Sequence, residues 1–258
     1  AWKSSRVKKI KRYVDRMYVI LPFEKEFYGK FGYPVFYEGN PLIDSIGDFN
    51  KNCKSLQEFM GKNRLDKKPL VALIPGSRVQ ELRRMLPPML EMAGRFPACQ
   101  FVVAGFEGVD RNIYTSLMKG YGVPVLFGQT REIMKHAEAA LVTSGTATLE
   151  AALLNTPQVE CYRANPLSYF IARLLVKISH ISLVNLIAGK TVVTELIQQD
   201  MNPGRMSREL GRLLEDSSLV QEIREEYKAL SSALGAPGVI RRTANSIVRY
   251  LHGEAQDT

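Results

Sequence analysis

The sequence predicts an α/β protein built around an open, doubly wound parallel sheet. From Leu70 onward, short apolar runs alternate with amphipathic segments. Strands separated by single helices pair in parallel with right-handed crossovers. Two of the runs, Leu70–Ile74 and Ala139–Val142, lead through turns of small residues into helices. Ligands of such sheets bind beyond the carboxyl ends of the strands, so both turns are candidate binding loops.

The bounds of the individual elements are predicted from the spacing of apolar residues and from the positions of turn and capping residues. We expect strands at 70–74, 100–104, 123–127, 139–142, 158–162 and 181–184, and helices at 80–96, 112–119, 130–137, 147–154, 166–177, 191–199, 206–215, 219–233 and 239–251. The run 167–178 is unusually apolar, which favours a buried interdomain or dimer helix over a membrane-facing one.

The first 45 residues predict a smaller group of α/β units. A basic N-terminal helix with one apolar face precedes a strand at 17–21, a helix at 22–31 and a strand at 34–37. The cationic face of the first helix is typical of a solvated surface. An anionic membrane or a nucleic acid could also bind it.

Composition narrows the class of protein. The 258 residues carry a formal charge of +9 with 45% hydrophobic and 24% charged residues, as in an ordinary soluble protein. The three cysteines are far apart and have no neighbours at metal-ligand spacing, which argues against disulfides and a metal site. The sequence shows neither a bilayer-length apolar run nor a signal peptide, so we expect a cytoplasmic protein.

The turn Ser144-Gly145-Thr146-Ala147 is the first candidate anion site. A helix that opens on small residues directs free N–H groups and a positive dipole end at the ligand. Glu150 follows within two turns, where a carboxylate can accept hydrogen bonds from a ribose. Read alone, the turn could equally be an ordinary helix cap.

The turn Gly76-Ser77-Arg78 is the second candidate. Gly76 permits close approach of the backbone, Ser77 offers a hydroxyl group, and the guanidinium of Arg78 suits phosphate oxygens. Because both turns end strands of one parallel sheet, together they favour a nucleotide diphosphate over simple capping.

Several motifs, in order along nearly the whole chain, resemble those of the lipid-A-disaccharide synthase family. They are Leu21-Pro-Phe-Glu24 with Phe27-Tyr28, Gly39-Asn40-Pro41-Leu-Ile-Asp44, Pro75-Gly-Ser-Arg78, Ser144-Gly-Thr-Ala147 with Leu149-Glu150, Tyr162-Arg163, and Ser182-Leu-Val-Asn185-Leu-Ile-Ala-Gly189. Each motif is weak alone, but the ordered series is specific.

The resemblance implies a glycosyltransferase of the GT-B fold. Its donor would be UDP-2,3-diacylglucosamine, its acceptor 2,3-diacylglucosamine 1-phosphate, and its products lipid A disaccharide 1-phosphate and UDP. Neither a metal nor a cofactor is implied, since helix ends and arginine neutralise the leaving diphosphate. It also implies peripheral contact with the cytoplasmic face of an anionic inner membrane, no nucleic-acid partner, and leaves a homodimer open.

The same resemblance assigns site residues. The turns at 76–78 and 144–147 would hold the diphosphate, and Glu150 the ribose. Arg163 and Asn185 match motif positions that line the cleft, and the backbone of the turn at Gln129 would hold uracil. The general base is expected in a preceding part of the family's N-terminal domain, so we expect negligible turnover from these 258 residues alone.

We therefore expect four parts. These are the last units of an N-terminal acceptor domain at 1–45, a linker at 46–68, a nucleotide-sugar donor domain at 69–234, and a C-terminal helix at 235–258 that packs back on the N-terminal domain. Two positions depart from the family pattern: Glu38, and Glu160 within an apolar strand. A buried unpaired carboxylate is costly, so each must be exposed, neutral or paired.

The alternatives are other enzymes of the same fold and a binding module. A UDP-N-acetylglucosamine epimerase or the peptidoglycan N-acetylglucosaminyltransferase would share the donor site. A basic nucleic-acid-binding module would fit the charge, but the sequence lacks a recognition motif for it. A dinucleotide-binding domain is disfavoured, since neither loop has the Gly-x-Gly-x-x-Gly pattern.

Overall fold

The computed structural model describes residues 4–163 and 180–253. Its chain forms two compact units, one of residues 1–52 and 229–258 and the other of residues 53–228. The helix expected at 166–177 lies outside the described residues. The predicted fold class, an α/β chain of GT-B type with a doubly wound parallel sheet, is confirmed.

The larger unit is built on a parallel sheet with the order β3-β2-β1-β4-β5-β6 in the described part of the chain. Its central strands are almost wholly buried, as expected for strands covered on both faces. The strands are β1 (Leu70–Ile74), β2 (Gln100–Gly105), β3 (Val125–Phe127), β4 (Ala139–Thr143), β5 (Gln158–Tyr162) and β6 (Thr194–Ile197).

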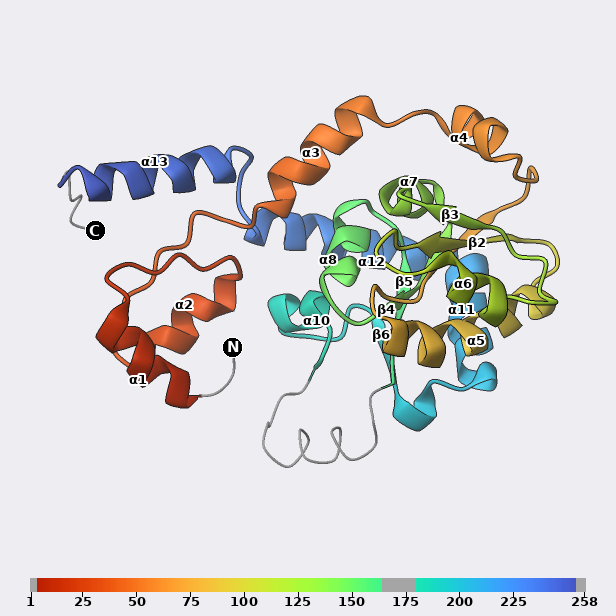
Figure 1. Cartoon of the computed structure of the whole chain (residues 1–258), viewed down its shortest axis with the longest axis horizontal. Helices are drawn as coiled ribbons and strands as arrows, with labels where there is room; N and C mark the ends of the chain where they lie inside the picture. The colour runs from red at the N-terminus through yellow and green to blue at the C-terminus, as the bar shows by residue number, and fades with distance from the viewer. Residues whose placement is uncertain (1–3, 164–179, 254–258) are drawn as a thin grey trace. The chain divides into compact units, whose positions relative to one another are not determined.

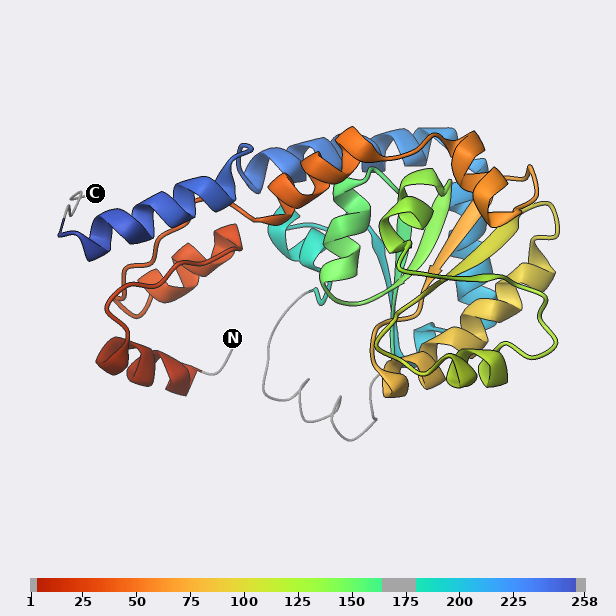
Figure 2. The same cartoon turned by 45° about the horizontal axis from the view of Figure 1, so that its top comes forward.

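Helices cover both faces of this sheet (Figures 1 and 2). On one face α5 (Val79–Arg95) packs against α11 (Pro203–Glu215), and on the other α7 (Thr130–His136) packs against α8 (Thr146–Leu153). The apolar side chains of α5, from Leu82 to Met92, are buried under this packing. The remaining helices of the unit are α4 (Leu56–Asn63), α6 (Arg111–Leu117), α10 (Leu183–Ala188) and most of α12 (Ser217–Ala233).

Strand order reverses direction between β1 and β4, which lie side by side. Ile74 is in register with Val142, so the two strands end at the same level of the sheet. This is the topological switch point, where open α/β sheets bind their ligands. Both predicted loops therefore start at the same edge of the sheet, side by side.

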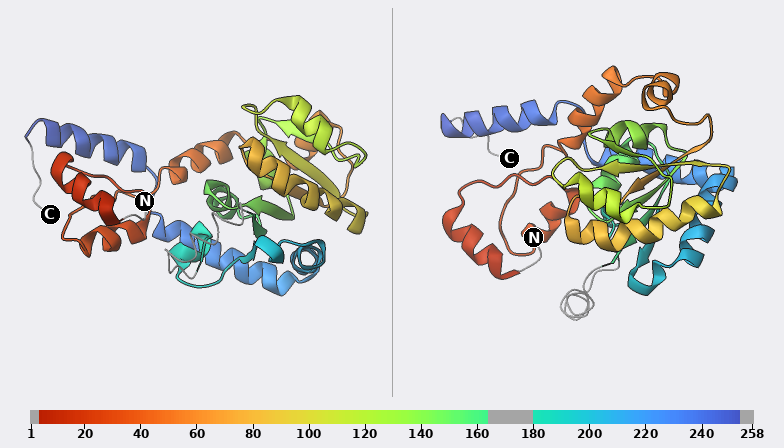
Figure 3. Two further views of the ribbon diagram at one scale, coloured as in Figure 1. Left: turned by 60° about the horizontal axis from the view of Figure 1, so that its bottom comes forward. Right: turned by 45° about the vertical axis from the view of Figure 1, so that its right-hand side comes forward.

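The smaller unit joins the two ends of the chain. It contains α1 (Ser4–Tyr13), α2 (Pro22–Gly29), α3 (Leu42–Asn52) and α13 (Val239–Leu251), and Figure 3 shows α1, α2 and α13 in one group. Val7 of α1 and Tyr28 of α2 are buried in a core with Val19, Tyr33 and Val35. Arg16 lies 3.8 Å above the ring of Phe36.

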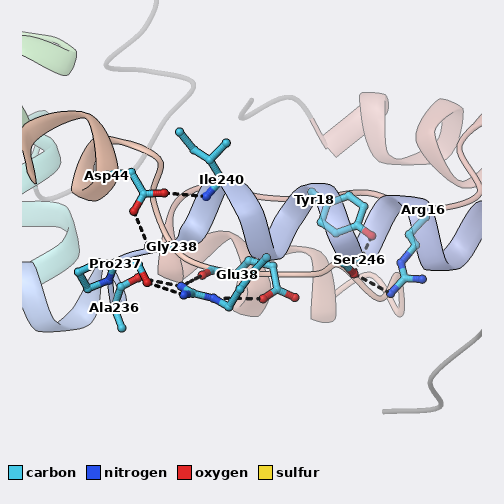
Figure 4. Close-up of polar contacts among 10 residues, drawn as sticks. Arg16, Tyr18, Glu38, Asp44, Ala236, Pro237, Gly238, Ile240 and Ser246 are labelled. Atoms are coloured by element: carbon cyan, nitrogen blue, oxygen red, sulfur yellow. Dashed lines mark hydrogen bonds and ion pairs between the residues drawn. The ribbon is translucent and has the colours of Figure 1, made fainter. Parts of the chain in front are cut away.

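Polar contacts fix α13 within this unit (Figure 4). The Asp44 carboxylate accepts hydrogen bonds from the Gly238 and Ile240 amides at 2.5 and 2.8 Å. Arg242 donates to the backbone oxygen of Glu38 at 2.9 Å, and the Tyr18 hydroxyl donates to Ser246. Glu38 is half-buried, with its carboxylate 3.8 Å from the Arg242 guanidinium, so this departure from the family pattern has a cationic neighbour.

Some predicted elements are wrong. The strands expected at 17–21 and 34–37 make only the single parallel bridge Tyr18–Phe36. The segment 181–184 is not a strand, because Leu183 already begins α10. The helix expected at 191–199 is β6 followed by the short 3-10 helix η1 (Gln198–Asp200), since Thr194–Ile197 pairs in parallel with β5.

Two further findings concern the organisation of the chain. The segment 46–68, expected to be a linker, contains the end of α3 and all of α4. Among the described residues, every helix is too short or too polar to cross a membrane.

Candidate anion and nucleotide site

The loop after β1 is built for close approach to an anion. Gly76 has φ +102°, a conformation that favours glycine, and it precedes the exposed residues Ser77 and Arg78. Arg78 is the N-cap of α5, so its amide and that of Ser77 lie at the positive end of a 17-residue helix. The loop can thus offer two amides and a guanidinium to phosphate oxygens.

In the structure, the Glu81 carboxylate already accepts hydrogen bonds from these donors. One oxygen of its carboxylate, Oε2, accepts from the Ser77 and Arg78 amides, each at 3.3 Å. The other oxygen accepts from the Arg78 guanidinium at 2.8 Å. The loop therefore holds an anion, and that anion is a side chain of its own helix.

The loop after β4 opens a second helix with small residues. Gly145 is the N-cap of α8, has φ +146°, and provides no side-chain cap. Its carbonyl oxygen accepts from the Thr148 amide at 3.2 Å and the Thr148 hydroxyl at 2.8 Å. The Ser144 amide donates to the Cys161 carbonyl at 3.1 Å, which ties the loop to β5. The first amides of α8 remain without intrahelical acceptors.

Glu150 is held by an arginine that sequence reasoning missed. Its Oε1 lies 2.8 Å from Nη2 of Arg131 on α7, and both side chains are largely buried. The Arg131 contact uses only one oxygen of this carboxylate, so the second oxygen can accept from a hydroxyl group. The pair also links α8 to the turn that follows β3.

That turn contains Gln129, the predicted uracil contact. Gly128 has φ +67°, and Gln129 follows as the N-cap of α7. The Gln129 side chain exchanges two hydrogen bonds of 3.1 Å with Asn63 of α4. Its amide group is therefore engaged, which leaves the backbone as the group available to a base.

Arg163 and Asn185 make contacts within the protein. Arg163 directly follows β5, and its guanidinium donates to the carbonyl of Met201. Asn185 is fully buried on α10 and donates to Val193 O at 2.9 Å and to Glu195 Oε1 at 2.8 Å. It also accepts from the amides of residues 192 and 193. Its side chain shapes the segment between α10 and β6.

Glu160 lies buried in the middle of β5. It is in register with Val142 on one side and Glu195 on the other, and it is 0% exposed. Burial raises the pKa of its carboxyl to about 7. Neither of its carboxyl oxygens has a hydrogen-bond partner within the described residues. Glu195, in contrast, accepts from the Ile181 and Ser182 amides.

The strand ends thus bring four of the predicted segments to one edge of the sheet. The turns at 76–78 and 144–147 follow neighbouring strands, and Arg163 follows the next strand. Gln129 precedes α7, which the Arg131–Glu150 pair joins to α8. Sequence reasoning missed Glu81, Arg131 and Glu195. Only Glu81 carried a local signal, as an acidic residue at the third position of a helix. The described residues contain no cluster of side chains suited to a metal ion.

Comparison with known proteins gives a consistent result. A family model described as lipid-A-disaccharide synthetase matches residues 1–247. The chain is 38% identical over 257 residues to the lipid-A-disaccharide synthase of Myxococcus xanthus strain DK1622. This match covers 97% of this chain and 66% of that protein. It is 40% identical over 264 residues to that of Nitrosococcus oceani, covering 98% of this chain and 66% of the relative. The chain therefore spans just under two thirds of the length of these relatives.

Solved structures share the fold at low identity. The S. aureus MnaA–UDP structure has a TM-score of 0.64 at 16% identity, covering 95% of this chain and 62% of that one. The UDP-GlcNAc 2-epimerase of Neisseria meningitidis bound to UDP-GlcNAc has a TM-score of 0.55 at 15% identity, covering 90% and 61%. At this level of identity the likeness shows the fold alone.

Proposed function

Because this chain belongs to the lipid-A-disaccharide synthetase family, we propose that it provides the donor-nucleotide site of a glycosyltransferase of lipid A synthesis. The reaction joins UDP-2,3-diacylglucosamine to 2,3-diacylglucosamine 1-phosphate and yields lipid A disaccharide 1-phosphate and UDP. The observation that carries the proposal is the pair of anion-binding turns that leave the neighbouring strands β1 and β4 at the switch point of the sheet.

In this proposal the two turns hold the diphosphate of the donor. Charge builds on that diphosphate as the glycosidic bond breaks, and prepositioned donors stabilise it without reorganisation. The Arg78 guanidinium, the Ser77 and Arg78 amides that precede α5, and the first amides of α8 supply such donors. Glu150 accepts from the ribose, and its contact with Arg131 holds it in place. Arg163 supports the third strand end, and the backbone at Gln129 contacts uracil.

Calorimetric titration of the chain with UDP, ADP and uridine tests the donor site. We expect UDP to bind more tightly than either of the others, since ADP carries adenine in place of uracil and uridine lacks the diphosphate. Formation of lipid A disaccharide 1-phosphate by the complete gene product, followed by mass spectrometry, tests the reaction. Equal affinities for UDP and ADP would contradict a uridine-specific site.

We further propose that the protein contacts an anionic membrane peripherally, at the cytoplasmic face. Support comes from the exposed cations Lys8, Lys9, Lys11 and Arg12 on α1. Each basic residue near such a surface contributes about 1 kcal/mol. Vesicle flotation tests this: binding to phosphatidylglycerol vesicles should weaken when these four residues become glutamine. Equal binding to neutral phosphatidylcholine vesicles would contradict an electrostatic contact.

A further inference from the structure

The hydrogen-bond donors at the start of α5 bind a carboxylate of the protein itself. We call the Ser77 amide, the Arg78 amide and the Arg78 guanidinium the anion seat. The Glu81 carboxylate accepts from all three, at 3.3, 3.3 and 2.8 Å. These are the same groups that the proposed function assigns to the donor diphosphate, so ligand and side chain cannot use them together.

The backbone at Gly76 is shaped for this carboxylate. A Cβ atom at Gly76 would lie only 2.6 Å from Oε2 of Glu81, and its φ of +102° disfavours other residues. A glycine here therefore permits the carboxylate to approach as far as the seat. The same open space admits a phosphate oxygen once the carboxylate has left.

The contact is weak enough to be exchanged. The Arg78 side chain is 81% exposed, and both amide contacts are longer than the usual 2.9–3.0 Å. Exposed ion pairs contribute little to stability. A diphosphate carries more charge than one carboxylate and presents more acceptor oxygens, so it can displace Glu81 from the seat.

We propose that Glu81 is an internal competitor of the diphosphate: its carboxylate fills the anion seat in the free protein and leaves it when the nucleotide binds. This inference rests on the proposed function. Glu81 therefore acts through the seat as a positioning residue. It holds the Arg78 guanidinium in the free protein and excludes anions that cannot displace a carboxylate.

The substitution Glu81→Gln tests this inference without removing the helix cap. Glutamine serves at the third helical position as glutamate does, so α5 retains its N-terminal hydrogen bond. Glutamine is neutral, however, and competes poorly for a guanidinium. We expect UDP to bind the variant about tenfold more tightly than the wild-type chain, with uridine affinity unchanged.

Two controls separate competition from general effects. Glu91→Gln removes the same charge from an exposed position of the same helix and should leave UDP affinity unchanged. Arg78→Ala removes one group over which carboxylate and diphosphate compete, so Glu81→Gln should gain less in that background. Thermal melting confirms that each variant is folded.

The outcomes distinguish this inference from the proposed function. If Glu81→Gln binds UDP as the wild type does, or more weakly, Glu81 is only a helix cap and the inference is overturned. If the wild-type chain and the variant both fail to bind UDP, the proposed function is overturned, and the inference with it. Tighter UDP binding with unchanged uridine binding supports both.

Discussion

Arg78 is the side chain on which the diphosphate site depends most directly. It is the one guanidinium among the predicted turn residues, and it stands at the N-terminus of α5 with its side chain 81% exposed. Arg78→Ala should weaken UDP binding by about 1.5–3 kcal/mol, the range for a hydrogen bond to a charged group. Arg83→Ala, at an exposed position of the same helix, is the matched control for lost positive charge. An unchanged titration would remove Arg78 from the site.

Glu150 allows the ribose contact to be separated from the diphosphate contact. Glu150→Ala should weaken UDP binding by about 1–3 kcal/mol but leave pyrophosphate binding nearly unchanged, since only UDP has a ribose. The Arg131 partner makes this a sharp test. If Glu150 acts by holding Arg131 against phosphate, both ligands will lose affinity equally, and the ribose role is wrong. Glu138→Ala, an exposed change before β4, serves as the control in calorimetry.

At the scale of elements, β5 carries a titratable group inside the sheet. Burial raises the Glu160 pKa from 4.5 to about 7. The folded state then holds a proton that the unfolded state releases between these values. The contribution of Glu160 to stability is therefore greatest below pH 4.5, falls as pH rises toward 7, and levels off above it. A shift of this size corresponds to about 3 kcal/mol.

Glu160→Gln removes this pH dependence because glutamine does not titrate. The free energy of unfolding of the wild type, from urea titrations at pH 5 and pH 8, should fall relative to that of the variant by about 2–3 kcal/mol. The control Glu91→Gln lies at an exposed position of α5. Its free energy of unfolding should change between pH 5 and pH 8 by the same amount as that of the wild type. If the free energy of unfolding of Glu160→Gln also changes with pH as that of the wild type does, the Glu160 carboxyl is paired or solvated in solution.

The elements that sequence reasoning placed correctly are those with a strong local signal. Strand–turn–helix units from Leu70 to Leu153 showed apolar runs bounded by small residues, and they located both anion turns. The segment 181–197 failed for a physical reason. Leu183–Ala188 is a short apolar run that periodicity cannot assign, and Gly189 ends it as a helix with φ +68°. The strand β6 that follows depends on parallel pairing with β5, which precedes α10 in the chain.

Contacts between side chains were equally hidden from the sequence. Pairs such as Arg131–Glu150 and Gln129–Asn63 join residues 19 and 66 positions apart. The spacing of residues along one helix or strand cannot reveal such pairs, because they form only when different helices pack together in the tertiary structure. The sequence could thus locate the turns of the candidate site but not the charges that surround them.

At the scale of the whole molecule, the chain closes on itself through α13. Residues 229–258 belong to the same compact unit as residues 1–52, and the Asp44 carboxylate caps α13 (Figure 4). Hydrogen bonds from the Ile240 and Gly238 amides lower the Asp44 pKa, against a smaller raising effect of burial. This cap is therefore present above the ordinary pKa of aspartate and is lost as pH falls through the lower folded-state value.

Asp44→Ala should destabilise this unit alone. Loss of a helix cap costs about 1 kcal/mol, which corresponds to roughly fivefold faster amide exchange where exchange requires the unit to open. Hydrogen–deuterium exchange with mass spectrometry should show the increase in peptides from 1–52 and 229–253, and no change in the β1 and β4 peptides. Asp44→Asn keeps the acceptor oxygen and should show a smaller effect. Equal acceleration in β1 and β4 would mean that the two units unfold as one, because the cap would then stabilise the whole chain rather than the unit that contains it.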